Sequence, residues 1–325
     1  MQYREYGKSG VRLSVIGLGG HEFHGDGKVK GYQDDPRRAT LRGTIMPGFG
    51  GEDRKAVVKR ALELGINFFD LTIDSEKEAM GRILKEMAPS QEIFIQTRPE
   101  GMVFRNPEAD NHRMKDYGLV KEETARILGL LGRPRLEVLN FGFMKEALRE
   151  DPEFIDKVGA NIARLKKEGL IRFASVDTNS GQTVLEPSIR SGHFDSFFFD
   201  FNVFHQVPAE TVIPLAVRGG MGVVPRVALA KRRILGIAEE AGIRDQAVMA
   251  SAAIKWVLRA PGVTSLMVGV ASIAQLESNA ALADNCEYTP EEREALDRLQ
   301  AYPPFVEKQK ETAALWRISG AAGYP

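Results

Sequence analysis

Strand-like and helix-like segments alternate from one end of this chain to the other, and that alternation restricts the fold more than any other feature. The strand-like segments are short apolar runs without a polar face, as in 66–70 (INFFD). Runs of this kind, separated by amphipathic helices, are typical of a parallel sheet covered by helices. Eight segments qualify: 12–19, 66–70, 92–97, 137–142, 171–176, 196–201, 222–227 and 264–268. Eight strand–helix units in one chain predict an α/β fold, a closed (β/α)8 TIM barrel, rather than an open sheet.

Helix-end signals support this division. The segment 289–292 (TPEE) is a capping box with proline at the first helical position. Asp245 precedes an apolar helical stretch and is a favourable N-cap residue. Gly65 follows a helical stretch over 52–64, where a glycine beyond the last turn is favoured. A chain of 325 residues could hold two domains of about 150 residues each, but the unbroken alternation predicts one barrel domain over 1–325.

Two long segments, 20–51 and 98–117, interrupt the alternation with polar residues that have no helical period. Each follows a predicted strand, so both are expected at the rim formed by the carboxyl ends of the strands, where barrel enzymes carry their active sites. Long loops at such a rim are commonly functional. A C-terminal tail begins at Tyr302 and includes Trp316 and Tyr324. Its sequence leaves two possibilities open, a segment folded over the barrel mouth or a flexible end.

Composition excludes several classes of partner and compartment. Lysine plus arginine and aspartate plus glutamate both number 44, so the net charge is zero, which gives no support for a nucleic-acid or membrane-surface partner. Cys286 is the one cysteine, so no intrachain disulfide can form. Residues 1–14 carry charges where a signal peptide would be apolar, and no apolar run approaches the ~18 residues that span a bilayer. We expect a cytoplasmic protein that acts on a small molecule; the oligomeric state is not predicted.

Several motifs, in order along the chain, resemble the aldo-keto reductase superfamily. They are 3–10 (YREYGKSG) with 18–20 (LGG), 61–70 (ALELGINFFD), 81–84 (GRIL), 167–172 (KEGLIR), 220–224 (GMGVV), and Gly269 with 275–277 (QLE) and Asn279. The resemblance spans nearly the whole chain and implies a barrel of the aldo-keto reductase type. Function does not follow from fold alone, so the site residues decide it.

The resemblance implies a catalytic set of which one member is present. In the family a tyrosine donates a proton to the carbonyl oxygen, a lysine paired with an aspartate lowers the pKa of that tyrosine, and a histidine orients the substrate. The aspartate is retained as Asp70, but the three other positions hold Ser75, Arg98 and Gly142. Arg98 can pair with Asp70 but cannot donate a proton. The segment 71–80 is also shorter than its family counterpart.

The resemblance implies NADP or NAD as cofactor, and here the positions are partly changed. Those that hold the nicotinamide amide read Asp177-Thr178 and Phe198, and the stacking aromatic is Arg226. At the adenine end Gly269, Ser272 and Asn279 are retained, whereas the basic residues of a 2′-phosphate site are replaced by Ala271 and Gln275. Lys231, with Arg232 and Arg233, could bind a phosphate or could be a solvated helix start. Binding of NADP, NAD or no dinucleotide therefore stays open.

Histidines at the rim could replace the missing proton donor. His21 and His24 follow the first predicted strand, and a histidine can act as acid or base at neutral pH. With Glu22, Asp70 or Asp74 they could also ligate a metal, but nothing fixes a third ligand, so no metal is expected. They could equally be solvated loop residues. Further rim candidates are Glu100, His112, Asp177, Asn202 and His205.

Three functions are compatible with these residues. The first is a divergent NAD(P)-dependent oxidoreductase acting on a small carbonyl or alcohol, with His21 or His24 as proton donor. The second is a lyase, isomerase or hydrolase on the same barrel, with Asp70 and Asp177 as acid and base and Arg98 binding a small anionic substrate. The third is a non-catalytic relative that binds a ligand or a partner protein.

Overall fold

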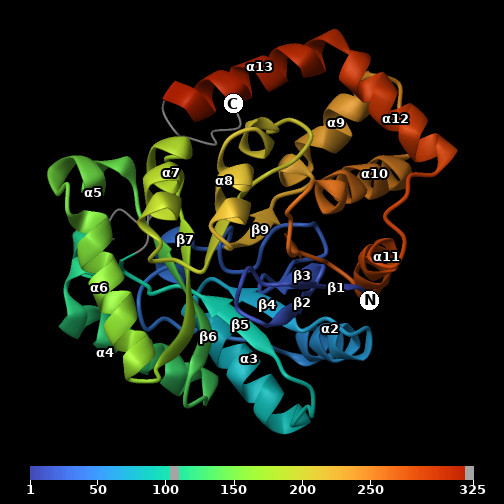
Figure 1. Ribbon diagram of the computed structural model, residues 1–325. Coiled ribbons are helices and arrows are strands. Elements are labelled where there is room, and N and C mark those ends of the chain that lie inside the picture. Colours follow the sequence, from blue (N-terminus) through green and yellow to red (C-terminus); the bar gives the residue numbers. More distant parts are fainter. Residues whose placement is uncertain (103–109, 319–325) are drawn as a thin grey trace.

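A computed structural model describes residues 1–102 and 110–318 and contains a closed barrel of eight parallel strands (Figure 1). Their order around the barrel is β10-β3-β4-β5-β6-β7-β8-β9. The strands are β3 (Ile16–Gly19), β4 (Phe68–Leu71), β5 (Phe94–Thr97), β6 (Leu136–Gly142), β7 (Ile171–Asp177), β8 (Ser196–Asp200), β9 (Gly222–Arg226) and β10 (Leu266–Val268). The predicted (β/α)8 barrel is thereby confirmed, with every predicted strand segment contributing one barrel strand.

Helices between the strands cover the outside of the barrel (Figure 1). They are α2 (Glu52–Glu63), α3 (Asp74–Met87), α4 (Tyr117–Leu131), α5 (Lys145–Glu150), α6 (Phe154–Lys167), α7 (Gln182–Ser191), α8 (Val212–Arg218), α9 (Arg233–Glu240), α10 (Gln246–Arg259), α11 (Ile273–Leu282) and α12 (Pro290–Ala301), with the short α1 (Pro36–Ala39) in the loop after β3. The described residues also form the 3-10 turns η1 (Asn111–Lys115), η2 (Val207–Ala209) and η3 (Ala230–Arg232). The predicted caps form: Thr289 and Glu292 make a reciprocal capping box, and Asp245 accepts from two backbone N–H groups of α10.

The segment 12–19, expected as one strand, is divided in two. Residues before the break form β2 (Arg12–Ser14), which pairs antiparallel with β1 (Tyr3–Glu5), and the barrel strand β3 begins only at Ile16. The hairpin closes the amino-terminal end of the barrel, where Tyr6 and Leu13 pack on Phe68 and other first-layer residues. A continuous apolar run cannot reveal this break, because both halves are buried, one below the barrel and one in its wall.

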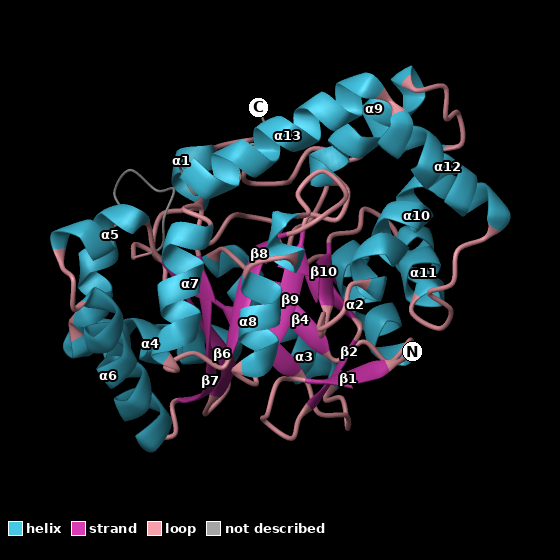
Figure 2. Ribbon diagram, turned by 45° about the horizontal axis from the view of Figure 1, so that its top comes forward, coloured by secondary structure: helices cyan, strands magenta, loops and turns pink. Residues whose placement is uncertain are grey.

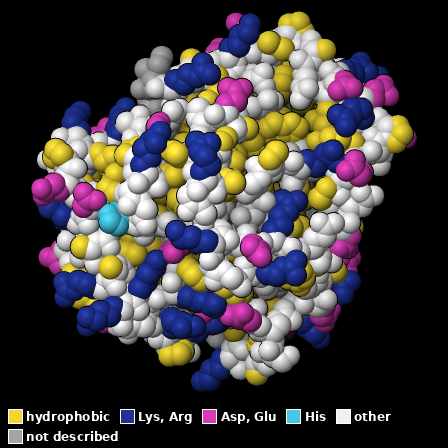
Figure 3. All heavy atoms as spheres, in the orientation of Figure 1, with side chains coloured by type: hydrophobic (Ala, Val, Ile, Leu, Met, Phe, Trp, Pro, Cys, Tyr) yellow, Lys and Arg dark blue, Asp and Glu magenta, His cyan; other side chains and the backbone are white. Residues whose placement is uncertain are grey.

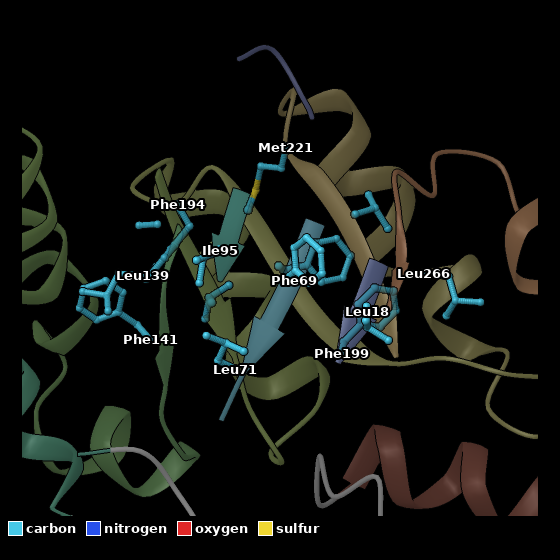
Figure 4. Close-up of a cluster of buried hydrophobic side chains, with 14 of the residues drawn as sticks. Leu18, Phe69, Leu71, Ile95, Leu139, Phe141, Phe194, Phe199, Met221 and Leu266 are labelled. Carbon is cyan, nitrogen blue, oxygen red and sulfur yellow. The ribbon is translucent and has the colours of Figure 1, made fainter. Parts of the chain in front are cut away.

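Side chains inside the barrel form an apolar lower layer and a polar upper layer. Alternate residues of a strand face the same side, so Phe68 and Phe94 of the lower layer are followed two positions later by Asp70 and Gln96. The residues that face outward are apolar and fill the space between strands and helices, as Figure 4 shows for Phe69 and its neighbours. The barrel mouth, at the carboxyl ends of the strands, is therefore the only interior region of the described barrel with a concentration of charged groups.

The described part of the C-terminal tail forms the helix α13 (Pro303–Ile318). Figure 2 shows it running across the end of the barrel at which β8 and β9 terminate. Its Phe305 ring packs on Phe204 at 4.7 Å, and its Trp316 ring packs edge-on against His205 at 4.5 Å. Of the two possibilities left open for the tail, this part folds onto the barrel, while Tyr324 lies outside the described residues.

The outer surface mixes acidic and basic side chains on the face shown in Figure 3, with a band of hydrophobic side chains below α13. None of the helices in residues 1–102 and 110–318 combines the length and the apolar character needed to cross a membrane.

Candidate active site

Asp70 lies at the end of β4, and two neighbours from β5 and the loop beyond it bind its carboxylate. Gln96 Nε2 donates to Oδ1 at 2.9 Å, and Arg98 Nη2 lies 3.4 Å from Oδ2. Burial raises the pKa of Asp70, although the Arg98 charge opposes that shift. The predicted pairing of Asp70 with Arg98 is therefore present at the barrel mouth.

A chain of ion pairs continues from Arg98 across the mouth. Arg98 Nη1 lies 3.8 Å from Asp177 Oδ2; Arg226 Nη1 donates to the same oxygen at 2.6 Å, and Arg226 Nε donates to Asp200 Oδ1 at 2.6 Å. The Arg226 guanidinium also lies 4.5 Å from the centre of the Phe198 ring. Burial lowers the pKa of Arg226, but Asp177 and Asp200 together raise it above its ordinary value. Arg226 is thus held as a fixed, flat cation between two carboxylates.

Polar atoms without a partner surround this chain of ion pairs. In residues 1–102 and 110–318 the buried atoms with no hydrogen-bond partner include Gln96 Oε1, both side-chain polar atoms of Asn140, Ser175 Oγ, Asp177 Oδ1 and Arg98 Nε. These residues lie on β5, β6 and β7 or just beyond β5. Buried polar groups are rarely left unpaired, so this wall of the mouth is suited to bind water or a polar ligand.

His21 lies beside the ion pairs on the loop that follows β3. Its Nδ1 is 2.7 Å from Glu76 Oε1 of α3, and Glu76 Oε2 accepts from the Thr72 N–H at 2.6 Å. Burial lowers the pKa of His21, but Glu76 more than compensates, with smaller effects of Asp70 and Arg98, and the pKa is raised. A raised pKa increases the fraction of His21 that carries a donatable proton at neutral pH.

The loop 20–51, which we term the rim loop, is anchored to α3. Met46 N–H donates to Ser75 Oγ at 2.8 Å, Gly43 N–H donates to Asp74 Oδ2 at 2.7 Å, and Arg82 donates to the Phe49 carbonyl at 3.0 Å. A small apolar cluster supports it, formed by Ala39, Phe49 and Ile73 with Tyr32 and Met46. Ser75 is therefore fully buried and holds the rim loop.

Tyr32 is a member of this site that the sequence analysis missed. Its hydroxyl is hydrogen-bonded to the Thr72 side chain, and its ring meets the His21 ring edge-on at a centroid distance of 5.0 Å. Burial raises the pKa of Tyr32, Glu76 adds to the rise, and Arg98 opposes it. One signal was available, since Tyr32 is the only tyrosine of the rim loop.

Of the remaining acidic and basic candidates, one lies at the barrel mouth and two lie in the rim loop. Glu100 lies on the mouth side of β5, 3.4 Å from Lys77 Nζ, and burial raises its pKa to about 7. His24 pairs with Asp34 at 3.0 Å on the partly exposed outer turn of the rim loop. Glu22 accepts from the Gly50 N–H and supports the loop backbone.

Two other polar candidates have structural partners. His112 pairs with Glu150 at 2.9 Å, and Asn202 Oδ1 accepts from the Phe204 N–H at 3.0 Å. His205 is buried against the Trp316 ring of α13, and neither of its ring nitrogens has a hydrogen-bond partner among the described residues. Over the described ranges 1–102 and 110–318, no three histidine, cysteine or acidic side chains are grouped so that they could hold a metal ion.

The predicted adenine-end residues lie beyond β10: Gly269 and Ser272 precede α11, and Asn279 lies within it. A Cβ atom on Gly269 would lie 3.4 Å from the Phe23 ring of the rim loop. Ser272 caps α11 by accepting from the Gln275 N–H, Gln275 Oε1 accepts from the Ala271 N–H, and Asn279 is partly buried. Lys231 lies in η3, where three consecutive non-glycine residues have positive φ.

Comparisons with known proteins agree with this architecture. A family model described as the aldo/keto reductase family matches residues 43–243 and 232–301. Two relatives named L-glyceraldehyde 3-phosphate reductase, from Escherichia coli O157:H7 and strain K12, are 22% and 23% identical, and each match covers 92% of both chains. The holo and apo forms of an aldo-keto reductase from Bacillus halodurans superpose with TM-scores of 0.66 and 0.64 at 20% identity, over 92% of this chain and 96% of that one.

Proposed function

Because the chain belongs to the aldo/keto reductase family, we propose that it is an oxidoreductase that reduces a small carbonyl compound with a nicotinamide dinucleotide. The observation that carries the proposal is the grouping of Asp70 and Arg98 with the His21–Glu76 pair at the barrel mouth. In that grouping Arg98 would stabilise the negative charge that develops on the carbonyl oxygen, and His21 would supply a proton. It does so without the family's tyrosine, lysine and histidine positions.

The residues at the mouth fit a dinucleotide, by contacts that differ from the family pattern. Asp177 Oδ1 has no partner among the described residues and could accept from the amide group of a nicotinamide. Arg226 is flat and fixed, and guanidinium planes stack well on rings. Gly269, Ser272 and Asn279 would hold the adenine end. When bound, the cofactor supplies the hydride. Ala271 and Gln275 supply no positive charge for the 2′-phosphate that distinguishes NADP from NAD.

The chain's own residues would stabilise charge and supply a proton. Arg98 Nε has no partner, so its N–H is free to donate to a carbonyl oxygen that gains negative charge. Glu76 keeps His21 more protonated than an isolated histidine at neutral pH. The Arg98 side chain is only 13% exposed, which strengthens its interaction with a developing oxyanion, whereas His21 is partly exposed.

A binding and turnover experiment tests this proposal. The purified protein should quench or enhance NADPH or NADH fluorescence in a saturable way, and should oxidise the bound nucleotide when glyceraldehyde or its 3-phosphate is added. The phosphorylated aldehyde is included because both relatives carry it in their names. An Arg98→Met variant should lose turnover while retaining nucleotide binding. Absence of saturable binding of either nucleotide would end the proposal.

A second candidate is a non-redox enzyme that uses the same acidic and basic groups. The observation that favours it is the Arg226 guanidinium fixed between Asp177 and Asp200, because the positions that resemble nicotinamide contacts bind one another. This candidate predicts turnover of a small polar metabolite without any dinucleotide, abolished in an Arg98→Ala variant. The third hypothesis is a non-catalytic role, and turnover of any metabolite by the purified protein would exclude it.

A further inference from the structure

Below the contact between Arg98 and Asp177, the barrel interior carries a layer of three polar side chains from neighbouring strands. Gln96 lies on β5, Asn140 on β6 and Ser175 on β7, and none is more than 1% exposed. Each stands two positions beyond an inward-facing residue of the apolar lower layer, namely Phe94, Val138 and Phe173. The residues on either side of Asn140 belong to the apolar cluster outside the barrel wall (Figure 4), so Asn140 points inward. We term Gln96, Asn140 and Ser175 the interior polar layer.

The interior polar layer has atoms that no described protein group satisfies. Gln96 Nε2 donates to Asp70 Oδ1 at 2.9 Å, whereas Gln96 Oε1 has no partner among the described residues. Both amide atoms of Asn140 and the Ser175 hydroxyl are likewise without a partner in residues 1–102 and 110–318. Asn140 and Ser175 are Cα partners across β6 and β7, so their free atoms belong to one place. Buried polar groups without partners destabilise a folded protein, and a ligand that pairs them removes that cost.

Arg98 links this layer to the proposed reacting group. It follows β5, yet its Nη1 lies 3.8 Å from Asp177 Oδ2 at the end of β7, so its side chain spans the end of β6, the strand between them. Gly142, the Cα partner of Asp177 on β6, has no side chain to obstruct that path. Asn140 comes two positions before Gly142 and therefore lies on the same face of β6, one layer deeper. A carbonyl oxygen bound at Arg98 Nε would direct the next atoms of the substrate toward Asn140.

The free atoms of the interior polar layer select the chemistry of the ligand. Asn140 Nδ2 can donate, Gln96 Oε1 and Asn140 Oδ1 can accept, and the Ser175 hydroxyl can do both. A hydroxyl group matches this mixture, because it also donates and accepts. A carboxylate or phosphate only accepts, so it would leave both amide oxygens unpaired beside the Asp177 carboxylate. A hydrocarbon would leave every free atom unpaired, and an ammonium group would be repelled by the Arg98 charge.

We infer that Asn140, together with Gln96 and Ser175, binds a hydroxyl group on the carbon next to the substrate carbonyl. The inference rests on the proposed function and narrows its substrate to small 2-hydroxy aldehydes and 2-hydroxy ketones. Asn140 is a specificity-determining residue: it contacts the substrate but moves no proton. A substrate without that hydroxyl leaves the layer unpaired, and a site built around a hydrogen bond rejects such an analogue strongly.

Two isomers that differ only in the position of one hydroxyl test the inference. With the nucleotide that the protein binds, kcat/KM for 2-hydroxypropanal should exceed that for 3-hydroxypropanal by about 10² or more. Asn140→Leu nearly keeps the shape of the side chain but removes both polar atoms. It should bring the two values within about fivefold of each other, by lowering activity on 2-hydroxypropanal. Ser175→Ala, a smaller change, should reduce the preference by about 2–10-fold.

The matched control is Asn161→Leu in α6. Asn161 is also buried, but its Nδ2 donates to the Met114 carbonyl at 2.9 Å. Its replacement should lower the free energy of unfolding and leave the isomer preference unchanged. Asn140→Leu should not lower the free energy of unfolding, because atoms without protein partners are replaced by apolar atoms. Urea unfolding compares the two variants. An Asn140→Leu protein as destabilised as Asn161→Leu would show a structural role for Asn140 and would overturn the inference.

A binding measurement needs neither turnover nor nucleotide. 1,2-Propanediol, the reduction product of 2-hydroxypropanal, should raise the melting temperature in a saturable way that 1,3-propanediol does not, and Asn140→Leu should abolish the difference. Equal effects of the two diols, or equal kcat/KM for the two aldehydes in the wild-type protein, overturn the inference while the proposed function stands. Wild-type protein that binds neither NADPH nor NADH overturns the proposed function, and the diols then decide on the hydroxyl site alone.

Discussion

Ser75 Oγ accepts a hydrogen bond from the Met46 N–H at 2.8 Å and so ties the later part of the rim loop to α3. The same hydroxyl donates to the Thr44 carbonyl at 3.3 Å. Through these bonds Ser75 anchors the rim loop on α3, and the same loop carries His21 and Tyr32. The bond between Ser75 and Met46 therefore helps to hold the loop that carries both residues.

Replacing Ser75 with alanine should loosen the rim loop. Met46 N–H would lose its partner, at a cost of about 1–2 kcal/mol. We expect faster hydrogen exchange over residues 43–50 and a lower kcat, because Tyr32 and His21 are then less firmly held. Mass-spectrometric hydrogen exchange measures the first effect. A Ser191→Ala variant, which removes a comparable side-chain bond to the Ser188 carbonyl in α7, should leave the rim loop unchanged.

Replacing Arg226 with leucine should strongly destabilise the barrel. The variant leaves the carboxylates of Asp177 and Asp200 buried without their principal cation. Removing one partner of a buried ion pair costs about 3–5 kcal/mol. Urea unfolding should report that loss in the free energy of unfolding, and adding Asp177→Asn should restore part of it. An Arg226→Leu protein with nearly wild-type stability would mean that water reaches these carboxylates.

His205 should make the protein sensitive to mild acid. Burial lowers the pKa of His205 to about 4 in the folded state, against about 6.5 in the unfolded chain. The folded pKa is depressed, so the neutral ring's contribution is complete above pH 6.5 and declines as pH falls toward 4. The decline is on the order of 3 kcal/mol.

A His205→Phe variant isolates this contribution. Phenylalanine keeps a ring beneath Trp316 but cannot bind a proton. The difference between wild-type and variant unfolding free energies, measured between pH 8 and pH 4, should therefore grow in favour of the variant as pH falls. Parallel curves for the two proteins would contradict the assignment of His205 as a buried neutral histidine.

Replacing Arg232 of η3, which has a left-handed backbone conformation, with glycine should stabilise the protein. Arg232 has φ of 72° and is exposed. Such a conformation costs a non-glycine residue about 1–2 kcal/mol, so Arg232→Gly should gain about 0.5–1 kcal/mol after the greater freedom of glycine in the unfolded chain is included. Thermal unfolding measures the gain. Lys167→Gly, in the last turn of α6 with ordinary helical backbone, should instead lower the melting temperature.

Much of the fold was predictable because its signals are local. The strand runs, the capping box at Thr289 and the glycine after 52–64 each depend on residues within a few positions of one another. The capping box and the glycine appear as predicted, and each strand run contributes a barrel strand. The division of 12–19 into β2 and β3 was not predictable, because a hairpin strand buried below the barrel has the same composition as a strand in its wall. The pairing of Asp70 with Arg98 followed from the ends of neighbouring strands.

The sequence by itself determined that an aspartate and an arginine would meet at the mouth of an eight-stranded barrel. Only the tertiary structure decided what surrounds them. The path of the rim loop brings Tyr32 beside Thr72 and His21 beside Glu76, and the closure of the barrel brings Arg226 between Asp177 and Asp200. These contacts join residues that are distant in the chain. Their geometry depends on how the loop is anchored and on the register of the strands, and no local sequence pattern specifies either.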